Sequence, residues 1–146
     1  MTENLANLKG LENLEQATDV SITNASGLTT LVLAGLKAVE RLELDTLDST
    51  TRIQLPSLET ANYIGIENHD LLSLEMDALT SVSRDLVIGA NPNLETLNGL
   101  PSLMSVGGNL SIVNNLKLPQ CEVDAIAVRL GGCQACTGND AMAVCH

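Results

Sequence analysis

An apolar-x-apolar motif recurs along this chain at a nearly constant interval, and this repeat restricts the possible folds more than any other feature. The first residues of successive motifs lie 22, 22, 22 and 24 positions apart. This interval is too short for repeats of paired helices, which need about 33 residues or more, and it fits leucine-rich repeats and β-solenoids. The motifs are Val20–Ile22, Leu42–Leu44, Ile64–Ile66, Leu86–Ile88 and Leu110–Ile112.

Each motif also shows the alternation of a half-buried strand. In Asn109–Val113, for example, apolar Leu110 and Ile112 alternate with polar or smaller residues. Side chains of a strand point to opposite faces with a period of two, so the motif residues face inward. The sequence therefore predicts a mainly β solenoid of about five coils over residues 8–118, each adding one strand to a parallel sheet. Ile66 and Leu86 are expected in its core.

One unit of the repeat, Leu94–Leu118, carries a resemblance to a known family. It contains regularly spaced leucines, the Gly107–Gly108 pair and two asparagines after the strand motif. This pattern resembles the receptor L-domain-like, leucine-rich-repeat-like units of bacterial cell-surface proteins. The resemblance implies a right-handed parallel β-helix exposed outside the cell, either secreted or at the cell surface. It also implies possible lipid anchoring through a segment absent from this chain. Coil two has no asparagine after Leu44, and coil three lacks the Gly-Gly pair.

After Leu118 the repeat ends, and the remaining sequence predicts a cap for the solenoid. Val123, Ile126 and Leu130 follow the spacing of one helix face, with Pro119 before them and Gly131–Gly132 after them. An amphipathic helix of this kind covers the open end of a solenoid. We therefore expect solenoid repeats over residues 1–118 and a helical, cysteine-rich cap over residues 119–146, within one structural domain.

All four cysteines lie in this cap, at Cys121, Cys133, Cys136 and Cys145. An even, clustered number predicts two disulfides and an oxidising compartment. The favoured pairing joins Cys121 to Cys133 and Cys136 to Cys145. The rival pairing, Cys121 with Cys145 and Cys133 with Cys136, requires a small ring. A zinc site is a further alternative, since Cys133 and Cys136 have zinc-ligand spacing and His146 follows Cys145.

Asparagine recurs two residues after the strand motif, at Asn24, Asn68 and Asn114. Stacked asparagines satisfy backbone groups that tight corners leave unpaired. We expect this column to line one corner of the solenoid, with a structural role.

Charge and motif content restrict the function. The formal net charge of −11 disfavours nucleic acids and anionic lipid surfaces as partners. No stretch is apolar enough for membrane insertion. No catalytic fingerprint is present, and neither His69 nor His146 lies in a patterned cluster, so we expect no enzyme activity and no cofactor. The acids Asp19, Glu43, Asp45, Glu67 and Asp85 are read as a solvated face.

The outward strand positions provide the candidate binding site. Gly65 and Gly89 are expected to leave a shallow trough in the sheet surface, beside apolar Tyr63 and Val87 and an acidic rim. The candidate residues are Arg41, Glu43, Asp45, Tyr63, Glu67 and Val87. The expected function is non-catalytic recognition of a protein or glycan ligand by a monomer, and the alternative is a structural, self-assembling element.

Overall fold

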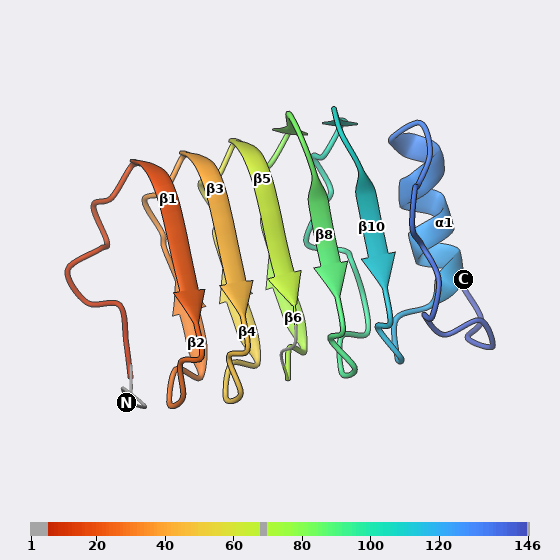
Figure 1. Ribbon diagram of the computed structural model, residues 1–146, viewed down its shortest axis with the longest axis horizontal. Helices are drawn as coiled ribbons and strands as arrows, with labels where there is room; N and C mark the ends of the chain where they lie inside the picture. Colours follow the sequence, from red (N-terminus) through yellow and green to blue (C-terminus); the bar gives the residue numbers. More distant parts are fainter. Residues whose placement is uncertain (1–5, 68–69, 146) are drawn as a thin grey trace.

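The computed structural model describes residues 6–67 and 70–145 and shows a right-handed parallel β-solenoid of about four turns. In Figure 1 the chain descends through the front strands and returns behind them while it advances toward the C-terminal helix. The mainly β, coiled architecture predicted from the repeat is confirmed.

A large parallel sheet forms the front of the solenoid (Figure 1), and every coil contributes one main strand to it. Short strands β7 (Ser81–Val82) and β9 (Ser105–Val106) extend the sheet at the bend where these strands begin. The sheet pairs Val20 with Leu42, and then Ile64, Leu86 and Leu110 follow in register. The main strands, in spatial order, are β1 (Gln16–Thr23), β3 (Ala38–Asp45), β5 (Thr60–Glu67), β8 (Leu86–Gly89) and β10 (Leu110–Val113).

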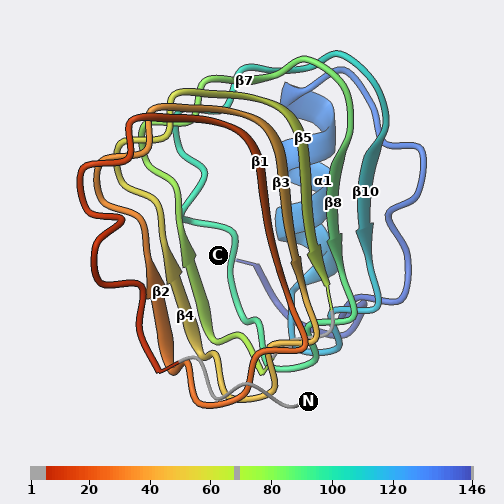
Figure 2. The ribbon, with the colours of Figure 1, turned by 60° about the vertical axis from the view of Figure 1, so that its left-hand side comes forward.

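A smaller sheet faces the large one across the core, as Figure 2 shows. It contains β2 (Thr30–Val32), β4 (Arg52–Gln54) and β6 (Ser73–Glu75), which also pair in parallel. Between the sheets, Ile66 and Leu86 are fully buried, so the inward register read from the sequence is confirmed.

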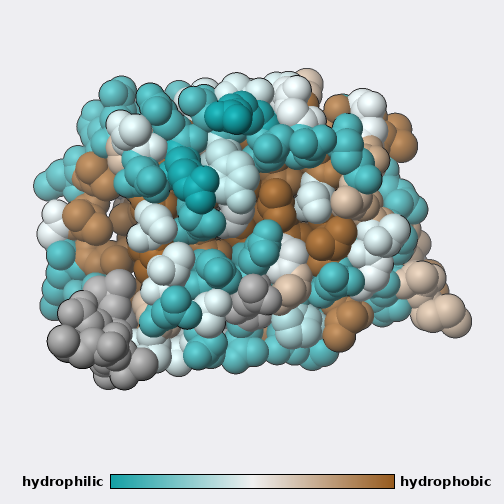
Figure 3. Space-filling view, viewed as in Figure 1, coloured by the Kyte–Doolittle hydropathy of each residue, from teal (hydrophilic) through white to brown (hydrophobic). Residues whose placement is uncertain are grey.

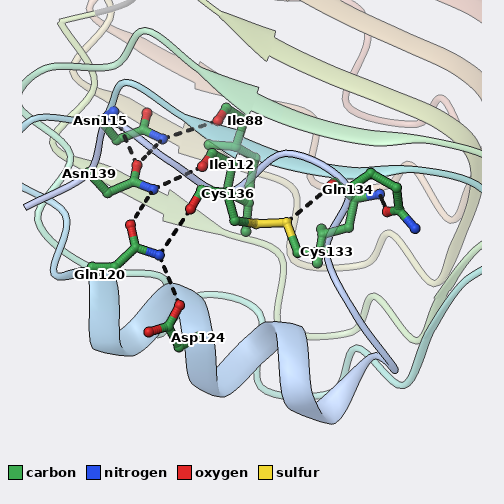
Figure 4. The surroundings of a disulfide bond; sticks show 10 residues. Ile88, Ile112, Asn115, Gln120, Asp124, Cys133, Gln134, Cys136 and Asn139 are labelled. Atoms are coloured by element: carbon green, nitrogen blue, oxygen red, sulfur yellow. Dashed lines mark hydrogen bonds between the residues drawn. A yellow bond between two sulfur atoms is a disulfide. The ribbon is translucent and has the colours of Figure 1, made fainter. Parts of the chain in front are cut away.

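The asparagine column at the corner is displaced by one residue from its predicted position. Asn24 and Asn114 instead adopt left-handed backbone angles, with φ of 52° and 58°, and Asn68 lies outside the described residues. Asparagine tolerates this conformation better than most residues, which explains its recurrence there. The stacked amides belong to the next position, at Asn91, Asn115 and Asn139, as Figure 4 shows for the last two.

The cap contains helix α1 (Gln120–Arg129), whose Val123 and Ile126 are buried against the last coil. Arg129 Nη2 donates to the Leu100 carbonyl over 2.9 Å, and the Glu122 carboxylate accepts from the Leu97 backbone N–H over 3.0 Å. The predicted capping helix is confirmed. Among the described residues no helix is both long and apolar enough to span a membrane.

After α1 the chain returns to the solenoid and adds a further rung, which the sequence repeat did not predict. Ile112 donates its backbone N–H to Ala135 over 2.8 Å, and Asn114 donates to Thr137 over 3.0 Å. Asn139 then continues the asparagine ladder. The rung covers the outer edge of β10, which removes an exposed strand edge.

The disulfides follow the rival pairing, so the favoured pairing is wrong. Cys121 bonds to Cys145 with a Cα–Cα distance of 6.1 Å, and Cys133 bonds to Cys136 at 6.0 Å. The cause is the helix, which separates Cys121 in its first turn from Cys133 beyond its end. Figure 4 shows the Cys133–Cys136 bond above α1, where it closes the start of the last rung.

This pairing gives a direct chemical prediction. Under non-reducing conditions the intact protein should be four hydrogens lighter than the reduced chain, and digestion should release a peptide that links Cys121 to Cys145. Reduction should lower the melting temperature but retain the β signal in circular dichroism, because both disulfides lie in the cap. A peptide that links Cys121 to Cys133 in the freshly isolated protein would contradict this connectivity.

Candidate functional site

The six candidate residues lie together on the outer face of the large sheet. In register, Arg41 is beside Tyr63, Glu43 and Val87 flank Gly65, and Asp45 is beside Glu67. All six are exposed or half-buried. Figure 3 shows the molecule from the same side as Figure 1, as a mainly hydrophilic surface with apolar areas between.

Arg41 links two neighbouring strands of this face. Its Nη2 donates to the Glu43 carboxylate on the same strand, β3, and its guanidinium carbon lies 5.0 Å from the centre of the Tyr63 ring on β5. The hydrogen bond to Glu43 and the charge of that carboxylate raise the pKa of Arg41. Cation–π contact and ion pairing together hold the arginine and the tyrosine in one arrangement.

The trough expected at the two glycines is reduced to a small hollow of about 50 Å³ at Gly65, whose lining includes Glu43, Asp45, Tyr63 and Glu67. A Cβ at Gly65 would lie 2.6 Å from the Tyr63 hydroxyl, which means that the tyrosine ring covers this glycine. At Gly89 a Cβ would lie within 3.7 Å of both Val113 and Glu67. Both glycines are buried. Because glycine has no side chain, the side chains of neighbouring residues lie across the backbone at these two positions.

A larger hollow of about 450 Å³ lies on the other side of Tyr63, toward the start of the strands. Four coils line it, each with two successive residues. The hollow is lined by Thr18, Asp19, Glu40, Arg41, Asn62, Tyr63, Arg84 and Asp85.

One column of this hollow was not predicted from the sequence, and it contains Thr18, Glu40, Asn62 and Arg84. Ladder pairing joins Ala17 to Val39 and Asp19 to Arg41 but skips Thr18 and Glu40 between them. In each coil two successive residues, such as Thr18 and Asp19, therefore face outward at a bend of the strand. The signal was present in the sequence, since the inward residues Ala17 and Val20 are three positions apart instead of two.

Some polar groups around the hollow already have partners. The Asp85 carboxylate accepts from the Asn109 backbone N–H over 2.7 Å. Ser83 donates its hydroxyl to the Asn62 Oδ1 over 2.7 Å. Asp45, below the hollow, accepts from the Thr46 hydroxyl over 2.9 Å. Within the described part of the chain, no group of three His, Cys, Asp or Glu residues is placed to hold a metal ion.

The environment of Tyr63 predicts an altered titration. Burial of the ring, followed by the negative charges of Glu43 and Glu67, raises the pKa of Tyr63 above 10.0, while Arg41 opposes this shift. Tyr63 is the only tyrosine and the chain has no tryptophan, so absorbance reports this residue alone. We expect the titration midpoint of Tyr63 in the folded protein to lie above that in the unfolded chain, as measured by ultraviolet absorbance against pH.

The sign follows from proton binding. Because the folded state holds the tyrosine proton more tightly than the unfolded state, stability should fall as the pH rises above the unfolded pKa of about 10. The denatured protein is the control. A folded midpoint at or below the denatured one would show that the ring is not covered as described.

In searches against known proteins, no family model, curated protein or solved structure matches this chain.

Proposed function

We propose that this protein is a non-catalytic recognition module that binds a partner through the outer face of its large sheet. The observation that carries the proposal is the Arg41–Tyr63 pair, held on the sheet by Glu43 and Gly65 beside a polar hollow. Tyrosine and arginine, together with tryptophan, are enriched among the side chains that dominate binding energy at interfaces. A prearranged pair also loses less side-chain entropy on binding.

The location proposed for this function is outside the cell. Two disulfides in the cap support an oxidising compartment, because thiols are kept reduced in the cytosol. The resemblance of the Leu94–Leu118 unit to receptor L-domain-like repeats supports a bacterial surface or secreted protein in particular.

A protein partner fits this face better than a regular glycan. Strands of the sheet are about 4.8 Å apart, so a periodic polymer running across them would meet equivalent positions at that interval. The column in register with Tyr63 instead contains a different side chain in nearly every coil: Asp19, Arg41, Tyr63 and Asp85. An aperiodic surface is suited to a single aperiodic partner.

The test is selection from a displayed library of random peptides on the immobilised protein, with a glycan array in parallel. We expect peptide ligands whose affinity falls at least about tenfold, or about 1.4 kcal/mol, in Tyr63→Ala and Glu67→Lys. The melting temperature of both variants should stay close to that of the parent. Leu72→Ala is the control, because Leu72 is 52% exposed and lies just before β6 in the smaller sheet.

If the selected ligands bind both variants as tightly as the parent protein, the binding site lies on another face. Ligands found only on the glycan array would overturn the choice of a protein partner but retain the recognition function.

A further inference from the structure

The hollow beside Tyr63 contains charged side chains of both signs that form no ion pair or hydrogen bond among the described residues, although the charge of Asp19 acts on Arg41. Of its charged residues, Arg41 is paired with Glu43, and Asp85 accepts a backbone hydrogen bond. The remaining three are Asp19, Glu40 and Arg84, all of them exposed. In the described part of the chain these three side chains form no ion pair or hydrogen bond.

The acceptors and donors are separated along the solenoid axis. Asp19 on β1 and Glu40 on β3 form an acidic half, at coils one and two. Arg84 and the Asn62 amide form a donor half, at coils three and four. Since the Asn62 Oδ1 already accepts from Ser83, its amide nitrogen remains to donate.

The spacing between the halves follows from the register. Glu40 is beside Asn62, because Val39 pairs with Ala61 and Arg41 with Tyr63. Arg84 is on the next coil, where its backbone N–H donates to the Asn62 carbonyl over 2.8 Å. Glu40 and Arg84 are thus two strand spacings apart, or about 10 Å.

We infer that this hollow binds an exposed segment of a partner protein that carries one basic and one acidic side chain about 10 Å apart. The basic group lies over Glu40 and Asp19, and the acidic group lies over Arg84 and Asn62. The inference rests on the proposed function and specifies its partner. It explains why both signs occur in one hollow of a strongly acidic protein, where general attraction alone would need only acids.

A polyproline II peptide provides a probe of the required spacing. This conformation has three residues per turn and rises about 3.1 Å per residue, so side chains at i and i+3 lie on one side, about 9 Å apart. The probe is a synthetic proline-rich peptide with Lys at i and Glu at i+3. Matched peptides carry two Lys, two Glu or two Gln at these positions. Binding is read from the fluorescence of Tyr63, since the chain has no other tyrosine and no tryptophan.

We expect the Lys/Glu peptide to bind at least about tenfold more tightly than each matched peptide. Arg84→Glu replaces the one basic residue of the column by an acid and should change the preference, so that the two-Lys peptide binds best. Glu40→Lys should make the two-Glu peptide best. Arg52→Glu is the control, because it makes the same charge change on β4 of the smaller sheet and should leave the order of affinities unchanged.

Three outcomes would overturn the inference. They are undetectable binding of the Lys/Glu peptide, equal binding of all four peptides, and tightest binding of the two-Lys peptide by the parent protein. The last result would mean that net charge alone attracts the probe. If library selection gives Tyr63-dependent ligands without paired charges, the proposed function stands and this inference fails. If no selected ligand depends on Tyr63, the proposed function fails as well.

Discussion

Replacement of Asn115 by Ala should lower the free energy of unfolding by about 2 to 5 kcal/mol, measured by chemical denaturation. Asn115 is fully buried. Its Oδ1 accepts from the backbone N–H of Asn91 over 3.1 Å, and its Nδ2 donates to the Ile88 carbonyl over 3.1 Å and to Asn139 over 3.2 Å. Truncation leaves the buried backbone N–H of Asn91 without its partner, which costs about 1 to 3 kcal/mol, and it removes both bonds that the Asn115 Nδ2 donates, each worth about 0.5 to 1.5 kcal/mol.

Two further variants show whether hydrogen bonding or volume causes the loss. Asn98→Ala removes the same atoms from an exposed side chain and should change stability by less than about 0.5 kcal/mol. Asn115→Leu restores bulk, and Leu47 fills the equivalent corner position in coil two. If Asn115→Leu is as stable as the parent, the position serves packing and the ladder adds no stability.

The ladder shows why a repeat can be found in a sequence while its register at a corner is misassigned. Two adjacent columns both favour asparagine, for different reasons. At Asn114 the backbone is left-handed, whereas at Asn115 the amide bonds to neighbouring coils. A count of asparagines after the strand motif cannot separate these causes. The interval of 24 residues that joins Asn91, Asn115 and Asn139 was the available signal.

The last rung was missed because its apolar pattern is absent. Gln134 and Cys136 occupy the places that correspond to Leu110 and Ile112, as the Ser111–Ala135 bridge shows. The disulfide-bonded Cys136 is half-buried against the core, whereas Gln134 is exposed and its side-chain oxygen accepts from the Leu110 backbone N–H. Hydrophobic periodicity therefore ends before the solenoid does, and only Asn139 carries the repeat forward.

The disulfide pairing, in contrast, was within reach of sequence reasoning. A helix rises about 1.5 Å per residue, so the eight residue steps from Cys121 to the end of the helix at Arg129 span about 12 Å. A disulfide needs Cα atoms within about 7 Å. The four residues from Arg129 to Cys133 would have to run straight back along the helix to close this bond, so the predicted helix already disfavoured it.

The shape of the binding face was not predictable in this way. Inward and outward positions follow from alternation, and all six candidate residues were placed on the correct face. Whether the Tyr63 ring stands up from the sheet or lies across Gly65 depends on its rotamer and on Arg41 from the next strand. Neither is encoded in the spacing of apolar residues.

Replacement of Leu86 by Ala should destabilise the protein by about 2 to 5 kcal/mol, because truncation of a buried leucine leaves a cavity as well as removing apolar burial. Leu86 is fully buried, and in the sheet it lies between Ile64 and Leu110. Leu72→Ala is a matched control, since the same atoms are removed from a side chain that is 52% exposed. Its loss should be below about 0.5 kcal/mol.

The comparison tests the register of the whole sheet. A shift of one residue exchanges the inward and outward faces of a strand, so Leu86 would then point to solvent and Val87 to the core. A loss below about 1 kcal/mol for Leu86→Ala, together with a large loss for Val87→Ala, would contradict the observed register. With the register as observed, Leu86→Ala should shift the denaturation midpoint without a change in the slope of the transition, because the unfolding reaction still exposes nearly the same surface.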